Sequence, residues 1–176
     1  LSNKNPWPAP GKRIVFTYKA APRAPEMIRN VSVKVIYELY DGAPILSKQI
    51  EVENQGKSSI VLNSFKSEIL ALTETAPKVH YGEPHEIRML DNPAVRWVFD
   101  HPEYEATGIR YYGQYKPARL EVCPPIGPDY EITPGMTFRS CTAFEMLRDA
   151  TDNERRGLAE CRFWRMMAPW TQENPI

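Results

Sequence analysis

The densest group of side chains able to bind a ligand lies in the middle of the chain. It comprises Trp97, Asp100, His101, Tyr104, Arg110, Tyr111, Tyr112 and Tyr115. Aromatic faces stack on the apolar CH surfaces of sugars, while carboxylate, guanidinium and phenol groups make the directed hydrogen bonds that sugar hydroxyls need. This composition predicts a carbohydrate-contact surface, whose candidate residues are Trp97, Asp100, Tyr104, Arg110, Tyr111 and Tyr112.

The alternative for the same segment is structural. Trp97 and Phe99 would then face the core, and alternate tyrosines would cover one face of a sheet. In a single strand over 109–115, side chains alternate between the faces, with Ile109, Tyr111 and Tyr115 on one and Arg110 and Tyr112 on the other. Only one face can be core, so the aromatic residue on the opposite face must meet solvent, a second domain or a ligand.

Local catalytic motifs are absent from the sequence. It has no GxSxG elbow, HExxH helix, Walker A loop or GxGxxG fingerprint. The two carboxylates of a glycoside hydrolase need only meet in space, and 22 acidic residues offer many such pairs. We therefore assign no catalytic residue from the sequence.

The cysteines give no sign of a metal site. Cys123, Cys141 and Cys161 form no CxxC pair, and no histidine stands near a cysteine pair. We expect no metal and no cofactor. Cys141 and Cys161 stand among apolar residues, which predicts buried free thiols.

Alternating apolar residues predict the strands that would position any site. A first strand is expected over Arg13–Tyr18. Period-two alternation then marks two strands, whose apolar positions are Val33, Val35, Tyr37 and Leu39 in one, and Leu46, Ile50 and Val52 in the next. Turn residues at 41–44 and 54–57 separate them from each other and from a third strand that starts at Ile60, so we expect a three-stranded meander. Tyr37, Leu39, Ile50 and Val52 should be buried on one face.

The rest of the chain follows the same pattern more weakly. Short strands are expected at 86–90, 95–99, 109–115 and 119–122, and a long one at 136–147. One helix is expected over 152–167, where Thr151 and Glu154 fit a capping box. Four arginines there (Arg155, Arg156, Arg162 and Arg165) are balanced by Glu154 and Glu160, which is typical of a solvated, ion-paired helix face rather than a phosphate site. Regular strands between turns favour an antiparallel sandwich or barrel over parallel βαβ units.

Length and composition limit the classes of protein to which the chain can belong. The 176 residues are 42% hydrophobic, enough for one folded domain. Lys plus Arg and Asp plus Glu are both 22, and this zero net charge argues against a nucleic-acid partner. The sequence contains no stretch of about 18 apolar residues, so it predicts no membrane-spanning helix. The 17 prolines mark many loops. Because the chain starts at Leu1 rather than Met, we expect it to be a piece of a longer protein.

Two segments carry a resemblance to a known family. Residues 36–56 (IYELYDGAPILSKQIEVENQG) resemble the strand, hairpin and N-x-G turn of the N-terminal β-supersandwich of family 36 α-galactosidase-like glycoside hydrolases. Residues 134–138 (PGMTF) resemble a later strand of that domain, and 168–175 (APWTQENP) stand where the family passes toward its catalytic barrel. The resemblance covers Ser32–Leu72 and Glu131–Ile176.

The resemblance implies a galactose-mutarotase-like supersandwich linked to carbohydrate metabolism. The catalytic aspartates of the family lie in the barrel, so no catalytic residue transfers to this chain. Residues 1–176 are then one β-sandwich domain, with an extended arm at 1–11 and a linker at 168–176 toward an absent catalytic domain.

The leading expectation for function is a non-catalytic module that braces a glycoside hydrolase or its substrate entrance. The alternatives are an independent carbohydrate-binding module and a small mutarotase-like or lyase-like enzyme. Expected partners are the catalytic domain of the parent chain, carbohydrate bound weakly, and a second copy in a homo-oligomer. A parent that degrades polysaccharide would favour a periplasmic or secreted location over a cytoplasmic one.

Overall fold

The computed structural model describes residues 9–71, 94–99, 108–111, 114–146 and 153–167. The protein is mainly β, with antiparallel strands and a single C-terminal α-helix among these residues. The elements are β1 (Gly11–Lys19), η1 (Glu26–Ile28), β2 (Val31–Tyr40), β3 (Ile45–Asn54), β4 (Ile60–Leu62), β5 (Glu68–Ala71), β6 (Val95–Phe99), β7 (Gly108–Tyr111), β8 (Gln114–Val122), β9 (Tyr130–Ile132), β10 (Thr137–Arg139), β11 (Ala143–Met146) and α1 (Asn153–Met167).

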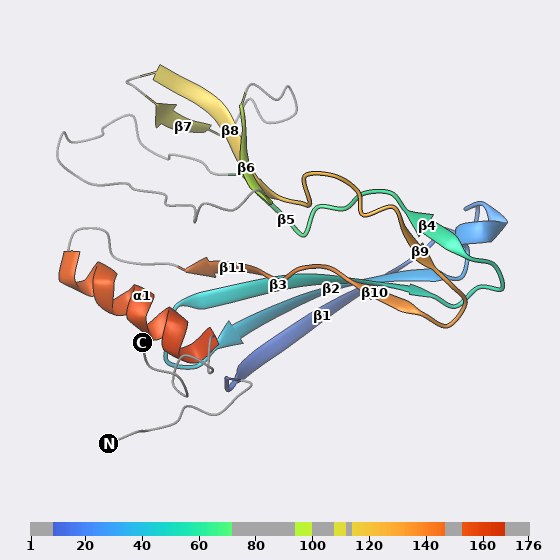
Figure 1. Ribbon diagram of the computed structural model, residues 1–176, viewed down its shortest axis with the longest axis horizontal. Helices are drawn as coiled ribbons and strands as arrows, with labels where there is room; N and C mark the ends of the chain where they lie inside the picture. The colour runs from blue at the N-terminus through green and yellow to red at the C-terminus, as the bar shows by residue number, and fades with distance from the viewer. Residues whose placement is uncertain (1–8, 72–93, 100–107, 112–113, 147–152, 168–176) are drawn as a thin grey trace.

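The larger sheet has the order β1-β2-β3-β10, and β11 also pairs with β3 (Figure 1). The long strand expected over 136–147 is therefore two strands. Ser140 causes the interruption, because its Oγ accepts the Ile50 amide at 2.9 Å while its own N–H donates to the Ile50 carbonyl. A side chain thus replaces one backbone acceptor in the ladder, and the pairing resumes at Ala143.

The expected meander is correct for β2 and β3 and wrong for the strand that follows. β4 leaves this sheet and pairs with β9. Asn54 explains the departure, since it is fully buried and its side-chain oxygen accepts the Gly56 amide at 2.9 Å in an Asx turn. Its amide group donates to the carbonyls of Ser58 and Ile132, which fixes the new direction of the chain.

A second layer lies over one part of the large sheet (Figure 1). It contains β5, β8 and β6 side by side, with β7 also paired to β8, and it continues into the β4–β9 pair. Phe138 of β10 joins the layers, because its ring centroid lies 5.2 Å from that of Phe65 and 5.4 Å from that of Tyr130. The two antiparallel layers have the character of the expected β-sandwich.

The expected single strand at 109–115 is wrong. β7 ends at Tyr111 and β8 begins at Gln114, so the two strands form a hairpin with Arg110 opposite Tyr115. Residues directly opposite each other share a sheet face, so Tyr115 belongs with Arg110 rather than with Tyr111. The strand expected at 86–90 lies outside the described residues.

Helix α1 agrees with the expected helix and closes one end of the large sheet (Figure 1). Met167 is buried against Ala43 and Ile45, and Phe163 meets Phe144 of β11 edge-on with centroids 5.7 Å apart. The whole linker expected at 168–176, and residues 1–8 of the arm expected at 1–11, lie outside the described residues. Within the arm, Gly11 belongs to β1 and the Pro10 carbonyl accepts the Asp41 amide.

The predicted buried face is only partly buried. Val52 is 8% exposed, but Leu39 is 54% exposed, so the prediction is wrong for Leu39. The buried residue of β2 with a large apolar side chain is Ile36, on the opposite face. The second layer explains the difference, since it packs over the β3–β10 side of the sheet, as at Phe138, whereas β1 is exposed along its whole length.

Candidate functional site

The predicted carbohydrate residues fall into two groups. Trp97 lies on β6, and Arg110 and Tyr111 lie on β7. Both strands pair with β8, where Trp97 is opposite Leu120 and Tyr111 is opposite Gln114. Asp100, His101, Tyr104 and Tyr112 lie outside the described residues. The topology thus brings the two strands onto one neighbour, and the carbohydrate surface itself stays a prediction.

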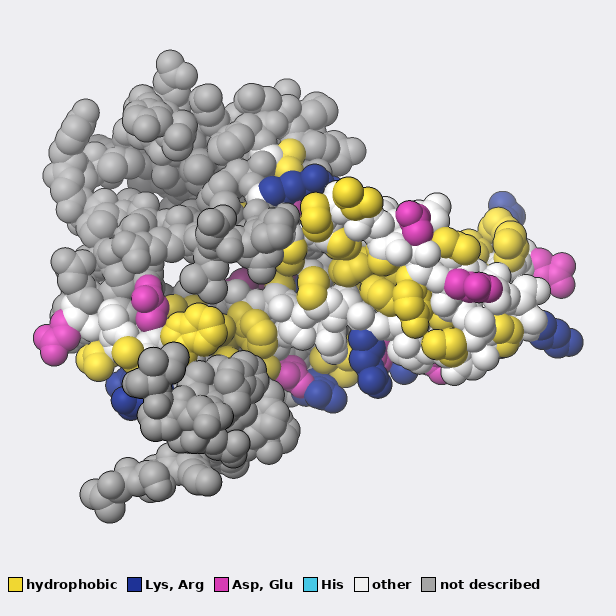
Figure 2. Space-filling model, in the orientation of Figure 1, with side chains coloured by type: hydrophobic (Ala, Val, Ile, Leu, Met, Phe, Trp, Pro, Cys, Tyr) yellow, Lys and Arg dark blue, Asp and Glu magenta, His cyan; other side chains and the backbone are white. Residues whose placement is uncertain are grey.

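An open apolar face on β1 and β2 is the most conspicuous surface among the described residues. The β1–β2 register places its members on one side of the large sheet: Ile14, Phe16, Tyr18, Val33, Val35, Tyr37 and Leu39. Ile14, Phe16 and Tyr18 are 59%, 49% and 57% exposed. Hydrophobic side chains reach the surface over the region of the strands in the space-filling view (Figure 2). Contiguous patches of this kind mark interaction sites in folded proteins.

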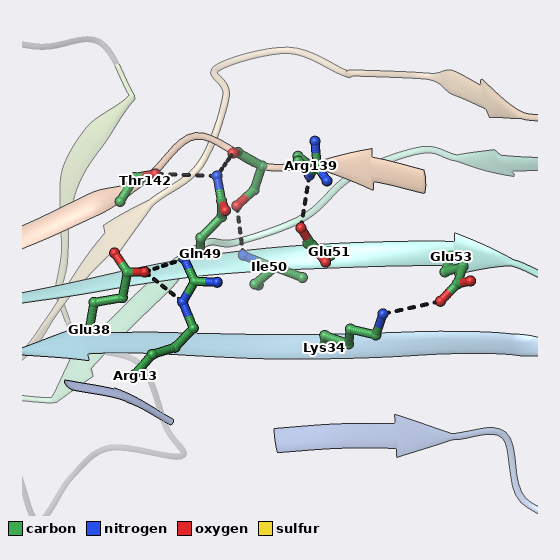
Figure 3. Close-up of polar contacts among 10 residues, drawn as sticks. Arg13, Lys34, Glu38, Gln49, Ile50, Glu51, Glu53, Arg139 and Thr142 are labelled. Carbon is green, nitrogen blue, oxygen red and sulfur yellow. Dashed lines mark hydrogen bonds and ion pairs between the residues drawn. The ribbon is translucent and has the colours of Figure 1, made fainter. Parts of the chain in front are cut away.

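The opposite face of the same sheet is polar along much of its length (Figure 3). Cross-strand ion pairs join Arg13 to Glu38 at 2.7 Å and Lys34 to Glu53 at 3.2 Å. Gln49 donates to the Ser140 carbonyl and to the Thr142 hydroxyl. These contacts pair charged and amide side chains of this face with one another.

The hydrogen bonds of this polar face change the pKa of Glu38. Burial opposes its ionisation, but hydrogen bonds from Tyr40 and Arg13 outweigh the effect and lower the pKa of the carboxyl. Tyr40 donates its hydroxyl to Glu38 at 2.7 Å, and burial raises the pKa of the phenol despite a hydrogen bond with Ser47. The pair therefore carries one fixed negative charge, neutralised by Arg13.

A cluster of charged side chains joins the layers. Lys48 of β3 contacts Glu68 of β5 at 2.9 Å, and its Nζ lies 5.5 Å from the ring centroid of Tyr37. Glu68 is 5% exposed. Glu145 of β11 completes the cluster, because burial and a hydrogen bond with Glu68 raise the pKa of Glu145 to about 7. The sequence pattern does not reveal this cluster, although Lys48 occupies an apolar position of an alternating strand.

A carboxyl group whose pKa is raised beside a second carboxyl group is also what acid–base catalysis uses. Here both are committed to contacts between β3, β5 and β11. A hollow of about 330 Å³ lies elsewhere, between the end of α1 and the β2–β3 turn. Its lining includes Asp41, Arg162 and Arg165. The position of the cluster therefore fits a junction between layers rather than a substrate site.

A second buried carboxylate is held by two cations. Glu121 of β8 is fully buried, with Lys66 at 2.7 Å and Arg96 at 2.8 Å. The guanidinium of Arg96 gives two nitrogens to the same carboxylate oxygen. Such a group is costly to bury unless it is paired, so this arrangement ties β6, β8 and the start of β5 together.

The cysteines correct one prediction. Cys123 is buried, whereas Cys141 and Cys161 are exposed rather than buried. Cys141 lies in the interruption between β10 and β11, and Cys161 lies on an outer side of α1, so neither reaches the core. Among the residues that the structure describes, no group of acidic, histidine or cysteine side chains could hold a metal ion. The described helices also include none long and apolar enough to cross a membrane.

Comparison with known protein families, with curated proteins and with solved structures finds no match for this chain.

Proposed function

We propose that this chain is a non-catalytic β-sandwich module of a carbohydrate-active protein of the α-galactosidase-like type, which packs against the catalytic domain through its open apolar face. The observation that carries the proposal is the exposure of Ile14, Phe16, Tyr18 and Leu39 on one side of a sheet whose other side is polar and ion-paired. The carbohydrate association comes from the resemblance of residues 36–56 and 134–138 to the family 36 supersandwich.

The composition of the open apolar face favours a protein partner over a sugar. Burial of apolar surface contributes about 25 cal/mol for each Å². Aromatic residues such as Phe16, Tyr18 and Tyr37 are enriched in the buried centres of protein interfaces. A sugar site needs several directed hydrogen-bond donors and acceptors among its aromatic rings. The residues of this face are mainly aliphatic or aromatic, and its polar atoms are two phenol hydroxyls and, at one end of β1, the ammonium group of Lys12.

The packing can be tested by cysteine accessibility. Cys141 and Cys161 are first replaced by serine, and Phe16→Cys is then compared in the 176-residue chain and in the complete gene product. Maleimide labelling at Phe16→Cys should be fast in the chain alone and slow in the complete product. Val61→Cys is the control, because Val61 is 60% exposed on β4, away from the face. Equal labelling at Phe16→Cys in both proteins would refute the packing.

The absence of catalysis is tested separately. The purified chain should not hydrolyse nitrophenyl α-galactosides or β-galactosides, because the paired carboxyls of Glu68 and Glu145 serve as an interlayer junction. Steady turnover by the 176-residue chain that disappears on substitution of one Asp or Glu would overturn this part of the proposal, whatever the labelling shows.

A further inference from the structure

Strand β1 is an uncovered edge in the described part of the chain. Its nine residues are all exposed, and among the described strands it pairs with β2 on one side only. No proline interrupts it between Gly11 and Lys19. Long, exposed edge strands present a row of unpaired backbone groups to other strands.

The backbone groups that face outward can be identified. Pro10 stands opposite Asp41 in the register, and its carbonyl accepts the Asp41 amide at 2.9 Å. Hydrogen-bonded and non-hydrogen-bonded pairs alternate along an antiparallel ladder. Lys12, Ile14, Phe16 and Tyr18 therefore bond to β2. The N–H and C=O groups of the intervening residues point to the free edge, and these residues are Gly11, Arg13, Val15, Thr17 and Lys19.

We propose that two copies of this chain associate through their β1 strands, antiparallel about a two-fold axis at Val15. In this register Val15 stands opposite Val15 of the second copy, and Arg13 stands opposite Thr17. All five outward-facing residues then exchange hydrogen bonds with the second copy. The inference goes beyond the proposed function and does not depend on it.

The side chains of β1 are complementary to themselves in this register. On the open apolar face, Ile14 meets Phe16 of the second copy, and Lys12 meets Tyr18. Aromatic and aliphatic pairs directly opposite each other stabilise a sheet, and an ammonium group is attracted to an aromatic ring. No two like charges stand directly opposite, and Arg13 is already paired with Glu38 on its own chain.

Neighbouring registers are less favourable, since an axis at Ile14 keeps like charges apart but pairs only residues 11–17 of β1. An axis at Phe16 would set Arg13 opposite Lys19 of the second copy, and an axis at Arg13 would set two arginines opposite each other. Like charges directly opposite destabilise a sheet. The axis at Val15 also pairs the full length from Gly11 to Lys19. A two-fold axis of this kind places the open apolar faces of both copies on the same side, so they form one continuous surface.

The test is the mass of the 176-residue chain as a function of concentration, measured by analytical ultracentrifugation. The wild-type chain should show a reversible monomer–dimer equilibrium. Val15→Lys should abolish the dimer, because it sets two lysines opposite each other at the axis. Val61→Lys is the matched control, since it adds the same charge at an exposed valine of β4, and it should leave the equilibrium unchanged.

Hydrogen exchange on the wild-type chain gives a second readout that needs no variant. In the dimer, the amides of Arg13, Val15 and Thr17 should gain protection with rising concentration, while those of Ile14 and Phe16 stay protected throughout. A monomer at every concentration would overturn the proposal. A dimer that survives Val15→Lys, or forms without added protection at Val15, would overturn it equally.

Discussion

The carboxyl groups of Glu68 and Glu145 share a hydrogen bond across the two layers of the sandwich. Glu68 also contacts Lys48 at 2.9 Å, and the positive charge of Lys48 acts on Glu145 by opposing the rise in its pKa. Two adjacent carboxylates repel each other, and one of them keeps its proton more strongly than an isolated acid would. The junction between β5 and the β3–β11 edge therefore depends on a proton.

This arrangement predicts a stability that falls as the solution becomes neutral. The pKa of Glu145 is raised from 4.5 to about 7 by burial and by Glu68. The folded state thus binds the proton more tightly than the unfolded state. The stabilisation is complete below about pH 4.5 and is lost as the pH rises through about 7. Because Glu145 is partly exposed, solvent screening reduces the effect to about 1 kcal/mol.

Urea unfolding of the wild type and of Glu145→Gln checks this prediction between about pH 5 and pH 8, a range that brackets the raised pKa of Glu145. Glutamine stays neutral and still donates to Glu68, so the loss of stability with rising pH should become shallower than in the wild type. Glu131→Gln is the control at an exposed glutamate of β9 and should keep the wild-type profile. Parallel profiles for all three proteins would contradict the assigned role of Glu145.

Lys66 should matter more than an ordinary surface lysine. Lys66→Met removes one of the two cations that hold the fully buried Glu121. The loss of a partner for a buried charged group costs about 1–3 kcal/mol. Chemical denaturation should show this loss, whereas Lys57→Met in the exposed turn should change the free energy of unfolding by less than about 0.5 kcal/mol. Equal effects of the two substitutions would show that Glu121 stays paired without Lys66.

Leu39 and Ile45 should respond differently to truncation. Ile45 is fully buried beneath α1, so Ile45→Ala should cost about 2–5 kcal/mol. Leu39 is 54% exposed on the open apolar face, so Leu39→Ala should cost less than about 1 kcal/mol. The comparison is made by denaturant unfolding of the chain at a concentration where it is monomeric. A large cost at Leu39 would mean that this face is covered in solution.

The local strand pattern of β1, β2 and β3 could be predicted because alternation depends on nearest neighbours along the chain. Which face becomes buried could not, because that depends on where the second layer packs. Val52 lies next to Phe138 of β10 and is buried, whereas Leu39 of the same face lies opposite Leu46 and is exposed. Both residues have the same local pattern, so only tertiary structure separates them.

The charged cluster shows a different limit. Lys48 stands at an apolar position between Leu46 and Ile50, which signals an unusual environment. Its partners come from residues 20 and 97 positions further along the chain, Glu68 and Glu145. The interruption at Ser140 was hidden for a related reason, since its cause is a hydrogen bond to Ile50, 90 positions earlier. Long-range pairings of this kind leave no periodic trace in one sequence.

Carbohydrate binding by the β6–β7–β8 layer is the remaining prediction. Trp97 on β6 and Arg110 and Tyr111 on β7 lie on strands that both pair with β8, where they stand opposite Leu120, Tyr115 and Gln114. A few stacking contacts and hydrogen bonds must offset the cost of association, so affinity should be in the millimolar range, about −4 kcal/mol. Titration with galactose-containing oligosaccharides, followed by amide chemical shifts, should move resonances within 97–115. Tyr112→Ala should weaken the response, and Tyr130→Ala on β9 should not. An unchanged spectrum at high ligand concentration would assign these aromatics to packing.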